Sequence, residues 1–365
     1  MKRNANVDLF RIAATLLVVL LHVLGQGGVL RSTHTDSVAY WCVWFLEICA
    51  FCAVNCFALI SGYVMEGRSI KLKSIIGLWL QVLFYSLAVT ALFFALLPES
   101  RTVKNALLAF MPIVGQQWWY ASSYFALFFF IPFLNAAIKH ISRQTYKKLL
   151  LLVLLGIGVI DCVFPYSDAF SLNSGYSAVW LMLVYLFGAY IKKYELHKRL
   201  TAAKSILGFF AMAALTLASK AGIHYLTEHL FGKSKFEDSL VSYMSVTVLL
   251  ASVFLFLFFL NLRISKPLSR LAVFLSPVSL GVYLIHVHPL VFGYVLKDAF
   301  VTLADKPLAV MLPLVLAACI GIFAVCAGAE LLRIQLFRLL RVNRLCEYTA
   351  EKLNALYLKL FYRRL

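Results

Sequence analysis

Apolar runs of about 20 residues follow one another along most of the chain, and short polar segments separate them. A helix of that length crosses the hydrocarbon core of a bilayer, because each residue adds about 1.5 Å along the axis. The runs predict an all-α fold, a polytopic membrane helix bundle with about ten transmembrane helices. Their expected positions are residues 8–30, 38–65, 74–97, 117–138, 149–165, 176–194, 203–222, 240–262, 271–296 and 308–333.

The composition agrees with a chain that lies in a lipid bilayer. Of the 365 residues, 62% are hydrophobic and 14% are charged, whereas a soluble domain has roughly 25% charged residues. The net charge of +18 would also suit a nucleic-acid-binding protein, but Lys and Arg gather in every second loop with roughly a threefold excess. This alternation follows the positive-inside rule, so it predicts both termini in the cytoplasm and no nucleic acid as a partner.

The chain changes character near residue 336. Leu353, Leu356, Tyr357 and Leu360 recur at helical spacing, and basic residues stand between them. The pattern predicts a transmembrane domain over 1–335 and a cytoplasmic basic amphipathic tail helix over 336–365. Such a helix either lies on the anionic cytoplasmic leaflet or docks on the underside of its own domain.

The first apolar run carries two ionisable side chains on one face. Arg11 and His22 are separated by three helical turns, which bring them into line about 16 Å apart along the axis. Charged residues inside a bilayer cost about 2.5–3.5 kcal/mol on insertion scales and usually mark a working site. Taken singly, Arg11 would reach the headgroups and His22 would be a satisfied interior residue, but the shared face favours a functional pair. Asp8 stands one turn before Arg11 and is expected to pair with it.

The ninth run contains a second intramembrane histidine, His286, between Tyr283 and His288. Tyr283 and His286 either contribute to a site or form a hydrogen bond between helices. The fourth run opens with Trp119 and Tyr120, which fit an interfacial aromatic belt or a platform for a sugar ring.

The second run and the loop that follows it supply further polar residues. Asn55 lies inside this run, and the loop carries the basic residues Arg68, Lys71 and Lys73. Cys42, Cys49, Cys52 and Cys56 also fall in the second run, on one side of a single helix. Four ligands on one side of a straight helix cannot surround a metal tetrahedrally, so no metal site is predicted.

Together these segments resemble the acyltransferase-3 family of bacterial membrane acyltransferases, many of which O-acetylate cell-surface polysaccharides. The most specific element is the Arg-x10-His spacing of Arg11 and His22 after Asp8. The stretches Phe-Ala-Leu-Ile-Ser-Gly-Tyr, Trp-Trp-Tyr and Tyr-Leu-Ile-His-Val-His-Pro add to it. The family often has an Arg-x-x-Arg pair after span two, and here that pair is Arg68 and Lys71. Lysine keeps the charge but loses bidentate phosphate recognition.

The resemblance implies an integral enzyme of the bacterial plasma membrane that transfers an acyl group, with acetyl expected, from cytoplasmic acyl-CoA. The implied acceptor is a hydroxyl of a cell-surface glycan or lipid-linked saccharide. Acetyl-CoA is a co-substrate, and no tightly bound cofactor is expected. The expected catalytic residues are His22, Arg11, Asp8, His286 and Tyr283; those for the donor are Arg11, Arg68, Lys71 and Lys73; those for the acceptor are Trp119, Tyr120, Asn55 and His288.

The residues suggest a chemistry for this transfer. The cationic groups would seat the phosphates of CoA. His22 would meet the thioester, either as a general base toward a sugar hydroxyl or as an acyl acceptor itself. The sequence leaves both routes open.

Two other classes of function compete with this interpretation. A proton-coupled transporter or flippase would use the intramembrane His, Arg and Asp residues as a proton relay, although no inverted repeat is visible. A small-molecule sensor or uptake domain, similar to the membrane part of vancomycin-resistance serine racemases, is the third interpretation. No prediction is made for the oligomeric state.

Overall fold

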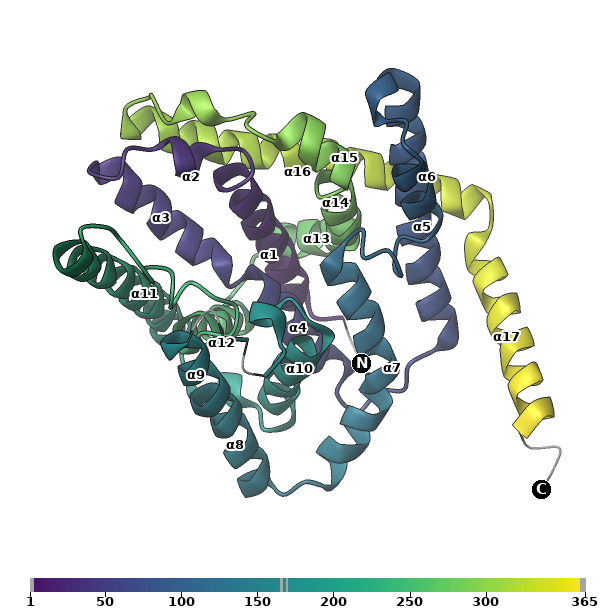
Figure 1. The fold of residues 1–365 in the computed structure, drawn as a ribbon. Helices are drawn as coiled ribbons and strands as arrows, with labels where there is room; N and C mark the ends of the chain where they lie inside the picture. The colour runs from purple at the N-terminus through teal and green to yellow at the C-terminus, as the bar shows by residue number, and fades with distance from the viewer. Residues whose placement is uncertain (1–2, 165–166, 169, 362–365) are drawn as a thin grey trace.

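The computed structural model describes residues 3–164, 167–168 and 170–361. In these ranges every regular element is helical and no strand occurs, which confirms the predicted all-α fold (Figure 1). Residue 165 of the predicted span 149–165, and residues 1–2 and 362–365 of the two predicted domains, lie outside the described residues.

Helix α1 (Ala5–Leu24) is the central element of the bundle (Figure 1). It packs against helices from most of the chain: α3 (Val38–Phe51), α4 (Ala53–Met65), α12 (Val246–Asn261), α13 (Lys266–Leu275), α14 (Ser279–His286) and α16 (Leu308–Leu339). Any side chain that projects from α1 therefore meets several segments that are distant in sequence.

The remaining helices surround this centre. They are α2 (Val29–Ser32), α5 (Leu72–Leu96), α6 (Val103–Phe110), α7 (Trp119–His140), α8 (Arg143–Leu152), α9 (Gly158–Val163), α10 (Ala178–Lys193), α11 (Ala202–Phe231), α15 (Pro289–Val291) and α17 (Val342–Phe361). Short 3-10 turns and two π-helical segments, η2 (Val153–Ile157) and η6 (Phe292–Leu296), connect or extend them.

Within the described residues, seven helical stretches are long and apolar enough to cross a bilayer. They are Ala5–Ser32, Val38–Met65, Leu72–Leu96, Trp119–His140, Ala202–Phe231, Lys266–His286 and Leu308–Leu339. The other three predicted spans fall on shorter or interrupted helices: 149–165 on α8, η2 and α9, 176–194 on α10, and 240–262 on α12. The membrane-helix character is confirmed, whereas the count of ten and the side of the termini remain predictions.

Helices α4 and α10 pack at backbone contact distance. A Cβ atom on Gly62 would stand 2.0 Å from the carbonyl oxygen of Tyr185, and one on Gly188 would stand 2.1 Å from that of Leu59. Both distances are far below van der Waals contact, so only glycine permits this approach. Small residues serve this purpose in membrane bundles, where close packing replaces the hydrophobic effect as the driving force.

Asparagine side chains close the ends of several helices. The last carbonyls of a helix lack partners within the helix and need donors from elsewhere. Asn6 donates from Nδ2 to the carbonyls of Phe259 and Leu262 at 2.9 and 2.8 Å. Asn135 donates in the same way to the carbonyls of Met65 and Arg68 at 2.8 and 3.1 Å, and so fixes the basic loop between α4 and α5.

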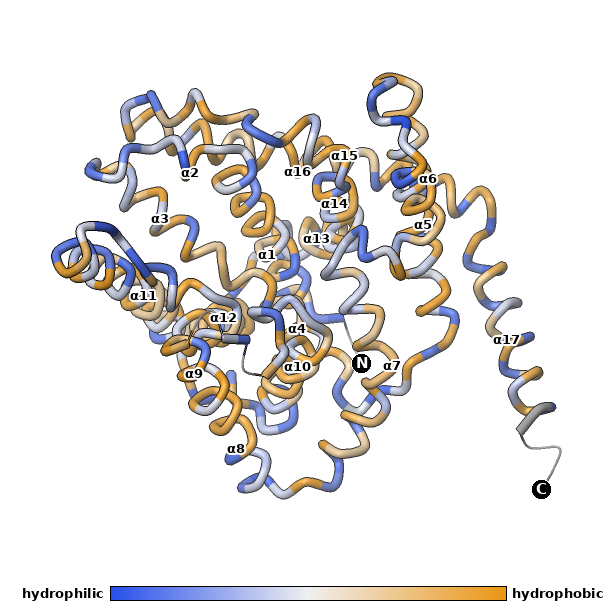
Figure 2. The backbone as a smooth tube through the Cα atoms, viewed as in Figure 1, coloured by the Kyte–Doolittle hydropathy of each residue, from blue (hydrophilic) through white to orange (hydrophobic). Residues whose placement is uncertain are grey.

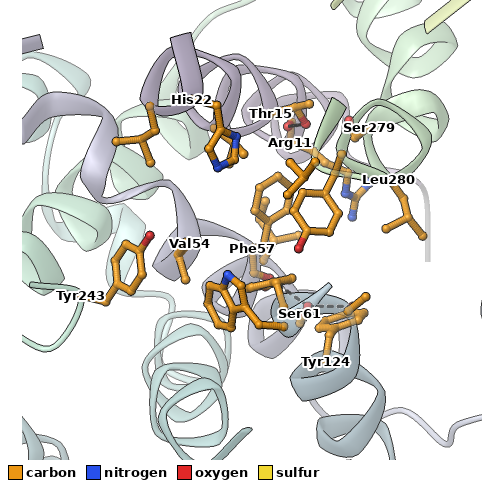
Figure 3. Close-up of a pocket in the computed structure, with 18 of the residues that line it drawn as sticks. Arg11, Thr15, His22, Val54, Phe57, Ser61, Tyr124, Tyr243, Ser279 and Leu280 are labelled. Carbon is orange, nitrogen blue, oxygen red and sulfur yellow. Dashed lines mark hydrogen bonds between the residues drawn. The ribbon is translucent and has the colours of Figure 1, made fainter. Parts of the chain in front are cut away.

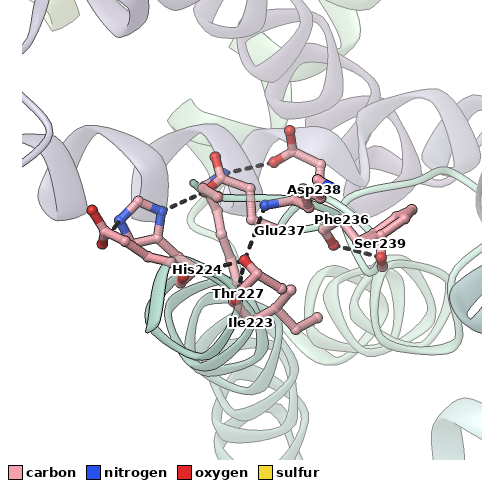
Figure 4. Close-up of polar contacts among 11 residues, drawn as sticks. Ile223, His224, Thr227, Phe236, Glu237, Asp238 and Ser239 are labelled. Atoms are coloured by element: carbon pink, nitrogen blue, oxygen red, sulfur yellow. Dashed lines mark hydrogen bonds and ion pairs between the residues drawn. The ribbon is translucent and has the colours of Figure 1, made fainter. Parts of the chain in front are cut away.

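An ionic cluster ties the segment after α11 to the bundle (Figure 4). The fully buried Lys220 donates to Glu237 at 2.8 Å and to Asp238 at 2.7 Å, and its Nζ lies 3.7 Å from the ring centre of Trp44. His224 contacts Glu237 at 2.6 Å. The cluster thereby positions the segment 232–245, which brings Tyr243 to the site described below.

The tail helix α17 is amphipathic, with polar and apolar positions alternating along it (Figure 2). Its first half packs against α5: Cys346 and Ala350 are buried, and Lys73 pairs with Glu347 at 2.7 Å. Farther along, Leu353 and Leu356 are exposed. The first half of this helix is thus docked on the domain.

Candidate active site

A cavity of about 220 Å³ lies between α1, α4, α5, α7 and α14 (Figure 3). Its wall is mostly apolar, and one end of it is formed by Tyr243 from the segment before α12. The polar and aromatic residues that line it are Arg11, Thr15, His22, Phe57, Ser61, Trp119, Tyr120, Tyr124, Tyr243, Ser279 and Tyr283.

Arg11 and His22 line this one cavity from the same helix (Figure 3). His22 lies toward the end that Tyr243 forms, and Arg11 lies toward the end with Tyr124 and Leu280. The helical period thus produces the shared face expected from the sequence. One continuous space thus extends from the guanidinium to the imidazole.

The guanidinium of Arg11 is held by groups at the start of the helix. Its Nη1 donates to Oδ1 of Asp8 at 3.2 Å and to Oγ of Ser276 at 2.9 Å. Ser276 donates in turn to Asp8 at 2.8 Å, and Arg3 donates to the other oxygen of Asp8 at 2.6 Å. Asp8 is buried, so these donors compensate its charge. Both contacts of Arg11 use Nη1, and no hydrogen bond joins its Nε or Nη2 to the described residues.

The two intramembrane histidines form a directed chain of hydrogen bonds. Nδ1 of His286 lies 2.6 Å from the carbonyl oxygen of Val282, and Nε2 of His286 lies 3.1 Å from Nδ1 of His22. A carbonyl oxygen only accepts, so Nδ1 of His286 carries the proton and its Nε2, in the neutral ring, accepts. His22 then donates from Nδ1. We therefore assign the lone pair of His22 to Nε2, the nitrogen of a general base or nucleophile.

Three hydroxyl groups in the cavity wall donate to no acceptor among the described residues, although the backbone N–H of Tyr120 approaches the oxygen of Tyr283. The three groups belong to Tyr120, Tyr283 and Ser279. Tyr124 differs, because its hydroxyl lies 3.0 Å from Oγ of Ser61. These hydroxyl groups add polar atoms to a mostly apolar cavity, and a ligand can form hydrogen bonds with them.

Two residues predicted for the acceptor lie outside the cavity wall. Asn55 is fully buried, donates to the carbonyl of Tyr243 at 2.8 Å and accepts from Nε1 of Trp180 at 2.9 Å. His288 is also fully buried; its Nδ1 accepts from the backbone of Leu290, and its Nε2 lies 3.0 Å from the amide of Gln117. Both side chains therefore hold in place segments that contribute other residues to the cavity wall, and neither lines the cavity itself.

The basic loop residues are likewise separate from the cavity. Lys71 and Lys73 line a second hollow of about 460 Å³, between the start of α5 and α17. Asn135 fixes the backbone at Arg68, as described above. The structure thus brings Arg11, His22, Trp119, Tyr120 and Tyr283 together in one cavity, with Asp8 and His286 directly behind them, and places the loop cations elsewhere.

Six of the polar and aromatic lining residues were not among the predicted site residues: Thr15, Phe57, Ser61, Tyr124, Tyr243 and Ser279. Thr15 stands one turn after Arg11 on the same stripe, so the helical period alone would have found it. Tyr243 lies more than 200 residues after Arg11 and His22 in the sequence. No local pattern marks it.

Comparison with known families agrees with this architecture. The family model of the acyltransferase-3 domain, described as an acyltransferase domain, matches residues 4–331 of the 365-residue chain. No curated protein and no solved structure matches the chain. The matched segment begins just before α1 and ends in α16, so it contains the whole cavity with Arg11 and His22. The chain therefore belongs to the acyltransferase-3 family and is a helical membrane acyltransferase.

Proposed function

We propose that this acyltransferase takes an acyl group, with acetyl expected, from cytoplasmic acyl-CoA and transfers it to a hydroxyl of a cell-surface glycan or lipid-linked saccharide. Its place is then the plasma membrane of a bacterium. The observation that carries the proposal is the single cavity that holds the guanidinium of Arg11 and the imidazole of His22. A cation and a base in one space suit an anionic donor with a reactive thioester at its far end.

The donor enters, in this proposal, from the side of Arg11. The free part of the Arg11 fork binds a phosphate oxygen of CoA in the manner of charge-assisted, bidentate contacts. Asp8 and Ser276 fix the guanidinium by their contacts with Nη1 and act as positioning residues. Arg68, Lys71 and Lys73 do not line the cavity, and in this proposal they act only from a distance, by raising the concentration of the polyanionic donor near the membrane surface.

The chemistry centres on Nε2 of His22. As a general base, it takes the proton of the acceptor hydroxyl while the oxygen forms a bond to the acyl carbon; the carbon–sulfur bond breaks, and the proton passes to the thiolate of CoA. In the second route Nε2 of His22 bonds to the acyl carbon and CoA leaves as a thiolate; the acceptor oxygen then bonds to this carbon, the carbon–nitrogen bond breaks, and the hydroxyl proton passes to the thiolate. In both routes His286 holds the ring and its tautomer from behind, as the third member of a catalytic triad does.

The acceptor side of the proposal is the aromatic end of the cavity. Trp119 and Tyr243 line it, and their rings stack at 6.2 Å with an angle of 21° between planes. Aromatic faces suit the apolar faces of sugar rings, whose hydroxyl edges then point toward the base. Asn55 contributes to the aromatic end of the cavity only indirectly, because its hydrogen bond to the backbone of Tyr243 holds that residue in place.

The test uses the purified full chain in lipid nanodiscs with acetyl-CoA and surface glycan extract. We expect acceptor-dependent release of CoA thiol and an added acetyl group on the glycan by mass spectrometry. His22→Ala and Arg11→Ala should abolish the release of CoA thiol, while the expression level and the melting temperature stay as in the wild type. Full activity in both variants would overturn the proposal. Proton-driven flux of a small molecule without consumption of acetyl-CoA would instead support a transporter.

A further inference from the structure

Most large buried hydroxyl groups of this protein have a partner. The hydroxyl of Tyr146 donates to the carbonyl of Leu186 at 2.7 Å, that of Tyr185 to Asn135 at 2.8 Å, and that of Tyr124 pairs with Ser61. Among the described residues, the buried hydroxyls of Tyr120 and Tyr283 donate to no acceptor, and the oxygen of Tyr283 lies near the backbone N–H of Tyr120. A buried donor left unpaired destabilises a fold, so its retention points to a partner that arrives with a ligand.

The two phenols are neighbours in the cavity of His22. Tyr120 comes from the first turn of α7 and Tyr283 from α14, and their ring centres are 6.1 Å apart with an angle of 74° between planes. The ring of Tyr283 also lies 6.4 Å from that of His286, the residue hydrogen-bonded to His22. Two unpaired O–H groups and the free nitrogen of a base thus share one mostly apolar space.

The third unpaired hydroxyl, on Ser279, is different in kind. It stands one turn before Tyr283 on the same helix. A serine hydroxyl in a helix can rotate to bond the backbone carbonyl of the preceding turn. A phenol has no such local acceptor, because its oxygen lies at the far end of a rigid ring.

We propose that the hydroxyls of Tyr120 and Tyr283 form an oxyanion pair for the acyl transfer. This inference rests on the proposed function and adds the groups that stabilise its transition state. When the attacking atom bonds to the acyl carbon, the electron pair of the C=O bond moves to oxygen, and both phenols donate hydrogen bonds to that oxygen without giving up their protons. When the carbon–sulfur bond breaks, the electron pair returns and the carbonyl re-forms; in direct transfer, the proton that His22 took from the hydroxyl then passes to the sulfur.

The surroundings favour this assignment over simple substrate binding. Hydrogen bonds to a charge are stronger than those to a neutral carbonyl, and more so where water is excluded. Donors fixed in advance therefore stabilise the oxyanion more than the thioester, which raises kcat and leaves KM almost unchanged. The pair serves direct transfer and an acyl-histidine route equally, since both pass through a tetrahedral oxyanion.

The test compares Tyr120→Phe, Tyr283→Phe and the double variant with wild type in nanodiscs. Each single variant should lose about 10²- to 10³-fold in kcat, the typical loss for one oxyanion donor, with little change in KM for acetyl-CoA. The melting temperature of Tyr120→Phe should be unchanged or higher, because its hydroxyl has no partner in the free protein, and that of Tyr283→Phe should change little, because its O–H donates to no acceptor. Tyr146→Phe is the matched control: it removes a bonded hydroxyl that does not line the cavity, so it should lower the melting temperature and leave kcat unchanged.

The outcomes separate this inference from the proposed function. An active wild type with unchanged kcat in both tyrosine variants overturns the oxyanion pair alone. Loss of activity that follows a falling melting temperature also overturns it, because that is the mark of a structural role. A wild type without acceptor-dependent consumption of acetyl-CoA overturns the proposed function and the pair together.

Discussion

The polar residues buried in this bundle either belong to the site or hold a distant segment in place. Only their hydrogen-bond partners distinguish these two kinds. His22 and Arg11 were predicted from the helical period, because one helix determines which of its residues share a face. Asn55 and His288 were predicted on the same ground of intramembrane polarity, yet both are satisfied by distant groups, the carbonyl of Tyr243 and the amide of Gln117. Those partners come from other segments, so sequence patterns alone do not separate a site residue from a residue that anchors a loop.

The histidine chain yields a prediction at the level of single atoms. His286→Leu removes the acceptor of the Nδ1 proton of His22, which then no longer has a fixed tautomer. We expect kcat to fall on the order of 10²- to 10⁴-fold, as when the orienting member of a triad is lost. His286→Gln should keep more activity, because its amide oxygen can accept the same hydrogen bond. Steady-state release of CoA thiol measures both, and equal kcat values in wild type and His286→Leu would contradict the relay.

The ionic cluster predicts a pH dependence of stability. Burial acts to raise the pKa of Glu237, but hydrogen bonds from Lys220, Ser234 and His224 outweigh it and hold the pKa at about 2. The ordinary pKa of glutamate is about 4.3. Since the folded value is lower, Glu237 stabilises the fold fully above its ordinary pKa, and this contribution is lost as the pH falls toward 2. The melting-temperature difference between wild type and Glu237→Gln should therefore shrink between pH 5 and pH 2; a constant difference would refute the assignment.

At the scale of elements, the glycine contact between α4 and α10 decides how closely the helices around the site approach. Gly188→Ala would place a methyl group against the carbonyl of Leu59 and should destabilise the fold by about 1–3 kcal/mol, as overpacking does. Gly222→Ala is the matched control, because no atom lies within 4 Å of its added Cβ. It should be neutral or slightly stabilising, since alanine favours the helix. Thermal melting in detergent measures both, and equal losses would show that the contact carries no strain.

Hydropathy predicted the bounds of the helices only in part. The apolar runs located Leu72–Leu96 to within two residues, with 74–97, but the run 203–222 ends nine residues before the end of α11. They overestimated α12, because hydropathy counts Tyr243 and Met244 as part of a span although both lie in a connecting segment that packs into the core. They also missed the π-helical interruption at Val153–Ile157. Apolar residues at the edge of a bundle are buried in tertiary contacts as readily as in lipid, so the length of an apolar run does not fix the length of a helix.

For the whole molecule, the number of crossings and the side of each terminus are linked. Seven crossings would place the two ends of the chain on opposite sides of the membrane, whereas ten would place them on the same side. The positive-inside pattern, with its excess of Lys and Arg in every second loop, predicts both ends in the cytoplasm. The shorter helices around α9, α10 and α12 must then supply an odd number of additional crossings. A cavity entered by cytoplasmic CoA at Arg11 requires the same orientation, because Arg11 lies close to the start of α1.

Cysteine labelling tests this topology directly. In a chain whose eight native cysteines are replaced, Lys233→Cys and Arg199→Cys place single exposed thiols just beyond the two ends of α11. A membrane-impermeant maleimide added to intact cells should label Lys233→Cys and leave Arg199→Cys unlabelled until the membrane is permeabilised. Tags at both termini should behave like Arg199→Cys. If the C-terminal tag is accessible from outside while the N-terminal tag is protected, the number of crossings is odd, and the cytoplasmic placement of the basic tail helix is wrong.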